Sequence, residues 1–106
     1  MSDKRREPRQ SVSWPVRVAG ISGCGDGELI NASMCGVLFS STTVLENKEL
    51  ALVRITLDPS TSVDCVAQIV RVEQSGEKML YGADFRYMSP SDRQRLSFAL
   101  MVLRSS

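Results

Sequence analysis

The sequence predicts a mainly β domain, namely a six-stranded antiparallel β-barrel with a C-terminal α-helix. Three observations lead to this fold class. Short stretches with two-residue apolar alternation recur along the chain, brief polar or glycine-containing turns separate them, and one segment near the C-terminus has helical apolar spacing instead. Because an open meander would leave strand edges unpaired, closure of the strands into a barrel is favoured.

The first three strands are predicted at residues 12–18, 28–30 and 37–41. In the first of them, Val, Trp, Val and Val alternate with more polar residues, which is typical of a half-buried strand. Pro15 cannot donate a ladder hydrogen bond, so this strand is expected at an edge or a bulge. The glycine-rich stretch 20–27 predicts a loop.

Three further strands are predicted at residues 50–57, 62–73 and 79–85, joined by turns at 58–60 and 75–77. The second of these strands is long enough to be bent. Each strand has an apolar side, because successive side chains point to opposite faces. In the first of these strands Ala51, Val53, Ile55 and Leu57 share one face, and Leu50, Leu52, Arg54 and Thr56 share the other. The residues expected together on one side of the other two strands are Val63, Cys65, Ala67 and Ile69, and Met79, Tyr81, Ala83 and Phe85.

The C-terminal helix is predicted from Pro90 to about Leu103. Ser89 suits the N-cap, proline suits the first helical position, and Asp92 suits the positive end of the helix dipole. Apolar residues cover more than one side of the helix: Leu96, Phe98, Ala99, Leu100, Met101, Val102 and Leu103. Two interpretations stay open: the helix plugs the barrel, or its surplus apolar surface pairs with another chain, for example in a homodimer.

Length, charge and hydropathy argue against several classes of function. The 106 residues suit one domain, and the net charge of +1 argues against a surface that coats nucleic acid. No apolar run is long enough to span a bilayer, and no apolar segment near the start resembles a secretory signal. We therefore expect a cytoplasmic protein without membrane insertion.

The sequence contains no histidine, which removes Ser-His-Asp and Cys-His nucleophile pairs and histidine metal sites. It also lacks a P-loop and a dinucleotide-binding fingerprint. Cys24, Cys35 and Cys65 form no CxxC pair, so we interpret them as free thiols and small hydrophobic residues, in preference to redox or metal ligands. We expect no catalytic site, no metal and no enzymatic activity.

The most informative polar stretch is Asn31-Ala32-Ser33-Met34-Cys35-Gly36, the turn between the second and third predicted strands. If Asn31 ends its strand, its side chain and that of Ser33 point to the same side. Gly36 lacks a Cβ and allows a positive φ or the close approach of another group. The stretch would form a small polar platform, although asparagine, serine and glycine are also what ordinary turns contain.

A basic stretch, Lys4-Arg5-Arg6-Glu7-Pro8-Arg9, lies in a polar N-terminal arm predicted at residues 1–11, before a barrel domain at 12–106. Arg5 and Arg9 are four residues apart, which places both on one side of an extended chain or of a helical turn. Pro8 disfavours a helical conformation at Glu7, so an extended arm or turn is favoured. Most charge runs are solvated arms without a specific ligand, and that alternative applies here too.

Taken together, Arg5-xxx-Arg9 and Asn31-x-Ser33-x-x-Gly36 resemble the signature of the PilZ domain family, RxxxR followed by D/N-xSxxG. The sequences at 81–85 (Tyr-Gly-Ala-Asp-Phe) and 89–96 also resemble the family's last strand and closing helix. The resemblance covers nearly the whole chain. It implies a six-stranded barrel with a C-terminal helix, and a receptor for cyclic di-GMP, the bacterial second messenger.

The resemblance also implies a binding site. Arg5 and Arg9 would contact phosphates and guanine edges, while Asn31, Ser33 and Gly36 would contact guanine from the barrel side. Two other residues of the arm are further candidates: Arg6 as an accessory contact, and Lys4 as an influence on whether one ligand or a stacked pair binds. Cyclic di-GMP would be a ligand and not a catalytic cofactor. A stand-alone domain of this family would act on a downstream protein in trans, in motility, exopolysaccharide synthesis or virulence.

Three alternatives to a cyclic di-GMP receptor stay open. An adaptor with a PilZ-like shape would bind a protein without using the nucleotide, although such members typically lack the arginine motif. A barrel that binds single-stranded nucleic acid would need exposed aromatic residues beside a basic groove, and the near-zero net charge disfavours it. An enzyme that acts on the nucleotide would need a catalytic constellation, and none is found in the sequence.

Overall fold

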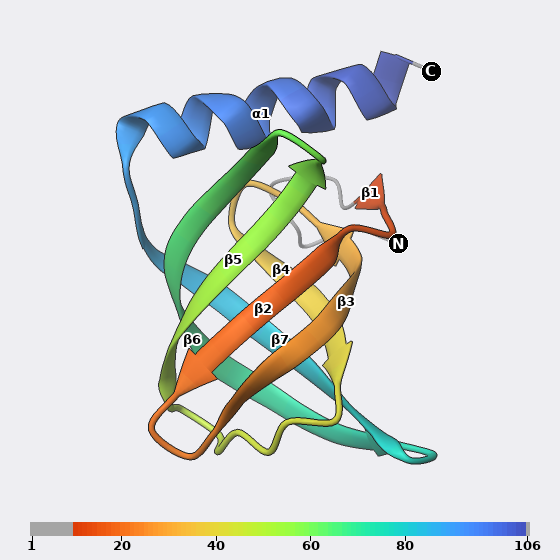
Figure 1. The fold of residues 1–106 in the computed structure, drawn as a ribbon, viewed down its shortest axis with the longest axis vertical. Helices are drawn as coiled ribbons and strands as arrows, with labels where there is room; N and C mark the ends of the chain where they lie inside the picture. Colours follow the sequence, from red (N-terminus) through yellow and green to blue (C-terminus); the bar gives the residue numbers. More distant parts are fainter. Residues whose placement is uncertain (1–9, 106) are drawn as a thin grey trace, which may run out of the picture.

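The structure is a computed structural model, and it describes residues 10–105. The strands wrap around a common interior, and the single helix of this range lies across one end of the barrel (Figure 1). In chain order the elements are β1 (Gln10–Ser11), β2 (Pro15–Gly20), β3 (Cys24–Ala32), β4 (Gly36–Ser41), β5 (Leu50–Asp58), β6 (Thr61–Ser75), β7 (Lys78–Met88) and α1 (Pro90–Ser105).

All strand pairs are antiparallel, in the order β1-β3-β2-β5-β6-β7-β4, and a β3–β4 pairing closes the sheet. β1 and β2 both pair with β3, so together they occupy one strand position. Between them, the Val12 N–H donates to the Ile30 carbonyl (3.0 Å), and the Leu29 N–H donates to the Trp14 carbonyl (2.8 Å). The predicted six-stranded barrel with a C-terminal helix is confirmed, and the interruption falls just before Pro15, which has no N–H to donate.

The barrel interior is filled by apolar side chains from alternate positions of the strands. Phe39 and Tyr81 are fully buried, and their ring centroids lie 5.4 Å apart. Leu57, Met79 and Phe85 are only partly buried and pack against the core. The other residues of the predicted apolar strand faces are buried: Ala51, Val53, Ile55, Val63, Cys65, Ala67, Ile69 and Ala83.

The helix α1 begins where its capping residues predict. The Asp92 N–H donates to the Ser89 hydroxyl (3.1 Å), which satisfies one of the free donors at a helix start. Leu96 and Leu100 are buried at the barrel end, as the plug interpretation requires. Apolar surface remains on the other side of the helix, at Phe98, Met101, Val102 and Leu103. Within the described residues, no helix is long and apolar enough to cross a membrane.

The glycine-rich stretch 20–27 is not the loop that the sequence predicts. Strand β3 already begins at Cys24, and only residues 21–23 form the turn. The glycines at 25 and 27 lie inside the strand because neighbouring atoms occupy the space where a Cβ would be, namely the Thr43 hydroxyl and the Ser40 carbonyl. Their abundance therefore reflects close packing of β3 against β4 and the segment that follows it, and not a flexible loop.

Candidate functional site

The turn between β3 and β4 is held by its own polar groups. The Ser33 N–H donates to the Gly36 carbonyl (3.0 Å), and the Cys35 N–H donates to the Ser33 hydroxyl (3.1 Å). The Phe85 N–H donates to the Cys35 carbonyl (2.9 Å), which ties the turn to β7. Ser33 is only 3% exposed, so within the described residues its hydroxyl serves first to shape the turn.

Gly36 is required by the close approach of β7. It is buried opposite Asp84, and a Cβ on it would overlap the carbonyl oxygen of Ala83. Its φ is not positive, since the positive φ angles of the described residues belong to Lys48 and Gly76. Of the two reasons for a glycine that the sequence left open, close approach is the one found here.

Asn31 faces outward because of a bulge in β3. Leu29 and Ala32 are both buried although they are three residues apart, since the register against β4 shifts between Leu29 and Asn31. Ile30 is the extra residue, and it is partly exposed. A bulge re-aims the side chains that follow it, so Asn31 lies on the outer face. The prediction that Asn31 and Ser33 point to the same side assumed that Asn31 ends its strand. In the structure β3 continues to Ala32, and Ser33 is buried in the turn that follows it.

Strand β1 pairs with the end of β3, next to this turn. Gln10 lies opposite Ala32, and Ser11 lies opposite Asn31. Arg9 directly precedes Gln10 in the sequence. The other predicted residues of the motif, Lys4, Arg5 and Arg6, lie with Arg9 outside the described residues. Figure 1 places β1, the β3–β4 turn and α1 at the same end of the barrel.

A hollow of about 320 Å³ lies on the outer face beside Asn31. Its size falls within the range of about 300–1,000 Å³ that is typical of small-molecule sites. A row across β3, β4, β7 and β6 forms its wall: Asn31, Leu38, Gly82 and Arg71. Asp84 and Val70 also line it. Ser33 and Gly36 are not among the residues that line the hollow, so the structure joins Asn31 to Arg71 and Asp84 there instead.

Arg71 is the residue that sequence reasoning missed. Strict alternation from Ile69 would place Arg71 inside the barrel, but the β6–β7 register shifts between these two residues. Val70 is the extra, exposed residue, so Arg71 faces outward opposite Gly82. A charged residue at a position that alternation assigns to the core is itself a signal of a bulge, and it could have identified Arg71.

The guanidinium of Arg71 is already held on the surface. Its Nε donates to a carboxylate oxygen of Glu73 at 2.7 Å, and its side chain is 60% exposed. A Cβ on Gly82 would lie 3.2 Å from the Cβ of Arg71. The missing side chain at Gly82 therefore keeps the space beside the arginine stem open, in the middle of the hollow.

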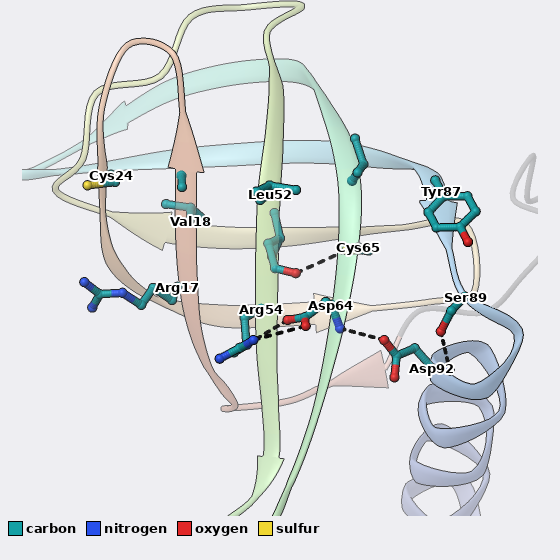
Figure 2. Close-up of a pocket in the computed structure, with 13 residues that line it drawn as sticks. Arg17, Val18, Cys24, Leu52, Arg54, Asp64, Cys65, Tyr87, Ser89 and Asp92 are labelled. Carbon is teal, nitrogen blue, oxygen red and sulfur yellow. Dashed lines mark hydrogen bonds and ion pairs between the residues drawn. The ribbon is translucent and has the colours of Figure 1, made fainter.

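A larger hollow, of about 580 Å³, lies on β2, β5 and β6 near the start of α1 (Figure 2). Its two arginines are paired with acids: Arg54 donates to Asp64 at 2.7 Å, and Arg17 donates to Asp26 at 2.6 Å. The hydrogen bond from Arg54 lowers the pKa of Asp64 below its usual value. None of the predicted site residues within 10–105 lines this hollow, and its two arginines are already paired with acids, so we do not assign the ligand site to it.

Groups for metal binding are not gathered in the described part of the chain. No cluster of three or more His, Cys, Asp or Glu residues there could hold a metal ion. Cys24 and Cys35 are exposed, Cys65 is buried, and all three are free thiols. Burial raises the pKa of Cys65 to about 12, so this thiol is protonated at neutral pH.

Comparison with known families decides the classification. The family model described as PilZ domain matches residues 3–101. The chain belongs to the PilZ domain family. This family generally binds cyclic di-GMP and is non-catalytic, in agreement with the prediction that the protein is not an enzyme. No curated protein matches the sequence significantly.

Solved structures share this PilZ fold at low sequence identity. The Bacillus subtilis inhibitor of motility (MotI/DgrA) has a TM-score of 0.81 and 14% identity, with 99% of this chain and 54% of that chain covered. The PilZ domain of YcgR from Escherichia coli with c-di-GMP has a TM-score of 0.80 and 14% identity, covering 97% and 93%. The MrkH–c-di-GMP complex of K. pneumonia has a TM-score of 0.75 and 14% identity, with 96% of this chain and 52% of that chain covered. The chain thus spans about half the length of the first and third of these structures.

Proposed function

We propose that this PilZ domain is a receptor for cyclic di-GMP that changes the conformation of its N-terminal arm on binding and signals to a partner in trans. One observation carries the proposal. Ser11 pairs with Asn31, and Ser11 follows Arg5-xxx-Arg9 by two residues in the sequence. This pairing supports a site to which both the arginine motif and Asn31-x-Ser33-x-x-Gly36 contribute.

The chemistry of these residues suits a cyclic dinucleotide. Such a ligand presents two phosphodiester anions and two guanine bases. In the proposed complex Arg5 and Arg9 bind the phosphates and guanine O6 and N7, because a guanidinium donates to both in a bidentate manner and stacks on bases. Asn31 offers an amide to a base edge. Arg6 and Lys4 are accessory contacts in this proposal, as Gly36 and Ser33 are contacts from the turn.

Arg71 adds a cation that comes from the barrel wall. It shares the outer hollow with Asn31, and no folding of the arm is needed to place it there. Charge-assisted hydrogen bonds contribute about 1.5–3 kcal/mol each, whereas ordering about ten arm residues costs roughly 1 kcal/mol or more each. A cation fixed by the sheet avoids that cost. Stacking of bases adds about 1–3 kcal/mol per base, and we expect an affinity near micromolar, about −8 kcal/mol.

The proposed signal passes from the arm to the helix. α1 contacts β1, and β1 directly follows Arg9. Ordering of residues 1–9 over a ligand would therefore change the surface beside α1. Backbone amide exchange measures this directly: protection in residues 1–10 should rise at saturating cyclic di-GMP. Unchanged exchange there would refute the conformational change while leaving binding itself intact.

The test of binding is isothermal titration with cyclic di-GMP, with GTP as the control ligand. We expect binding by the unmodified chain and its loss in Arg9→Ala. Arg104→Ala, which removes an equal charge near the far end of α1, is the matched control and should bind normally. Binding that survives Arg9→Ala would contradict the assigned arginine role, and a chain that gives no heat with cyclic di-GMP would refute the receptor function.

A second candidate function is a protein-interaction adaptor that does not use the nucleotide. The observation in its favour is the apolar surface of α1, where Phe98 is 67% exposed and Met101 is 54% exposed. The same surface supports the proposed homodimer contact through α1. Light scattering of the 11.7 kDa chain would give twice that mass for a dimer, reduced to the monomer in Phe98→Ser. A monomer at all concentrations would refute the homodimer.

A further inference from the structure

The hollow beside Asn31 contains a carboxylate for which the proposed function has not yet given a role. Asp84 lies exposed on β7, opposite Gly36 on one side and Gln68 on the other. It makes no ion pair with any residue in the range 10–105, whereas Arg71 is paired with Glu73. An unpaired anion would repel the phosphates of an anionic ligand. A ligand that fits beside Asp84 should therefore present hydrogen-bond donors to its carboxylate.

Guanine supplies such donors. Its N1–H and its N2 amino group point in the same direction along one edge of the base, while O6 and N7 accept hydrogen bonds along the next edge. A carboxylate has two acceptor oxygens and no donor, so it can accept from both groups of the first edge. Asn31 has only one acceptor oxygen, next to a donating amino group. Among the described residues that line the hollow, Asp84 carries the carboxylate.

The backbone leaves room for a planar base between the two charged residues. Gly82 lies opposite Arg71, and Asp84 follows two residues later on the same outer face of β7. Adjacent strands are about 4.7–4.9 Å apart, and alternate residues of a strand about 6.8 Å. A base that lies over the side-chain-free backbone of Gly82 would thus have Arg71 and Asp84 at two of its edges.

We infer that Asp84 makes the site specific for guanine: its carboxylate accepts hydrogen bonds from N1–H and N2–H of a base over Gly82, while Arg71 donates to O6 and N7 of that base. The inference rests on the proposed cyclic di-GMP function and deepens it. Adenine has no proton on N1 and no amino group at C2, so its binding would leave Asp84 facing an acceptor. A site built around a buried or engaged polar partner rejects an analogue that lacks the matching group.

The test compares cyclic di-GMP with cyclic di-AMP, by titration calorimetry, for the unmodified chain and for Asp84→Asn. This substitution keeps the shape of the side chain and removes the charge, and the sign of its effect is informative. If Asp84 acted only as a repelling charge, Asp84→Asn would bind cyclic di-GMP more tightly. If Asp84 acts as a hydrogen-bond acceptor, Asp84→Asn should weaken the binding of cyclic di-GMP by about tenfold to a hundredfold. It should also lower the preference for cyclic di-GMP over cyclic di-AMP by at least about tenfold.

The matched control is Glu77→Gln, which removes an acid in the turn between β6 and β7, away from the hollow. It should leave the preference between the two ligands unchanged. An unaltered melting temperature of Asp84→Asn verifies that the variant is folded, as expected for an exposed strand position. Unchanged or tighter binding of cyclic di-GMP with an unchanged preference would overturn the role of Asp84 alone. If the unmodified chain binds neither ligand, the receptor function and this inference both fail.

Discussion

Asn31 and Arg71 line the same hollow, although strict strand alternation would point both side chains into the barrel. In both strands one extra residue comes immediately before, Ile30 in β3 and Val70 in β6. Each bulge inverts the alternation that follows it and turns a polar side chain outward. The position of the candidate site therefore depends on two local irregularities of an otherwise regular barrel.

Arg71→Ala should weaken the binding of cyclic di-GMP by about tenfold or more, because a charge-assisted hydrogen bond of about 1.5–3 kcal/mol would be lost. Glu73→Gln should act in the opposite direction, since it releases the Arg71 guanidinium from its present partner. Titration calorimetry measures both effects. Arg54→Ala, on the outer face of β5 and not among the residues lining this hollow, is the control. Equal affinities of the Arg71 and Arg54 variants would contradict the role of Arg71.

Alternation and helix capping were sufficient to predict the barrel, the residues that share each strand face and the N-cap of α1 at Ser89. These features depend on patterns that repeat over many residues, so a local irregularity does not hide them. The bulges at Ile30 and Val70 depend on pairing with β4 and β7, which lie elsewhere in the sequence. For that reason Asn31 could be chosen from a motif, whereas Arg71 was missed, and only the conflict between its charge and the core position that alternation assigns to it pointed to the bulge.

The glycines also differ in whether their role can be predicted from the local sequence. Gly76 has a positive φ of 65° and sits in the predicted turn, so a local rule was enough. Gly27 and Gly36 are needed because another strand passes close to them, and that contact is tertiary. The stretch 20–27 was consequently mistaken for a loop, since its glycines look alike in the sequence whether they serve a turn or a close approach.

Gly36→Ala should reduce the free energy of unfolding by about 1–3 kcal/mol, the usual cost of forcing extra volume into a packed position. The added Cβ would overlap the Ala83 carbonyl, so β4 and β7 would have to separate beside the β3–β4 turn. We expect cyclic di-GMP binding to weaken as well, because the hollow is bounded by the same two strands. Urea denaturation measures the stability, with Ser40→Ala on the same strand as the control. A fully stable Gly36→Ala protein would refute the packing argument.

Tyr81→Phe should cost about 1–3 kcal/mol of stability without changing ligand affinity. The Tyr81 hydroxyl accepts from the Leu45 N–H (2.9 Å) and donates to the Thr43 carbonyl (2.7 Å), and the residue is fully buried. Removal of the hydroxyl leaves these backbone groups without that partner in the interior. Tyr87→Phe offers the matched control, because Tyr87 is 64% exposed and its change should be nearly neutral. Urea denaturation measures the stability of both variants. Equal losses of stability in Tyr81→Phe and Tyr87→Phe would contradict the assigned role of the buried hydroxyl.

The three cysteines should separate into two classes when they react with Ellman's reagent under native conditions. Cys24 and Cys35 are exposed and should react quickly, whereas Cys65 should react only after the protein opens or is unfolded in guanidinium chloride. Two causes protect Cys65: its side chain is buried, and its pKa of about 12 keeps it protonated even at mildly alkaline pH. Its thiol also donates a weak hydrogen bond to the Val53 carbonyl (3.6 Å).

Ellman's reagent can also measure whether a ligand covers the β3–β4 turn. Cys35 lies in the turn between Ser33 and Gly36, so saturating cyclic di-GMP should slow its reaction, while Cys24 at the start of β3 should be unaffected. Cys24→Ser and Cys35→Ser each leave one exposed thiol and allow the two rates to be measured separately. Equal protection of both thiols would indicate a global change in stability and not a ligand bound beside the β3–β4 turn.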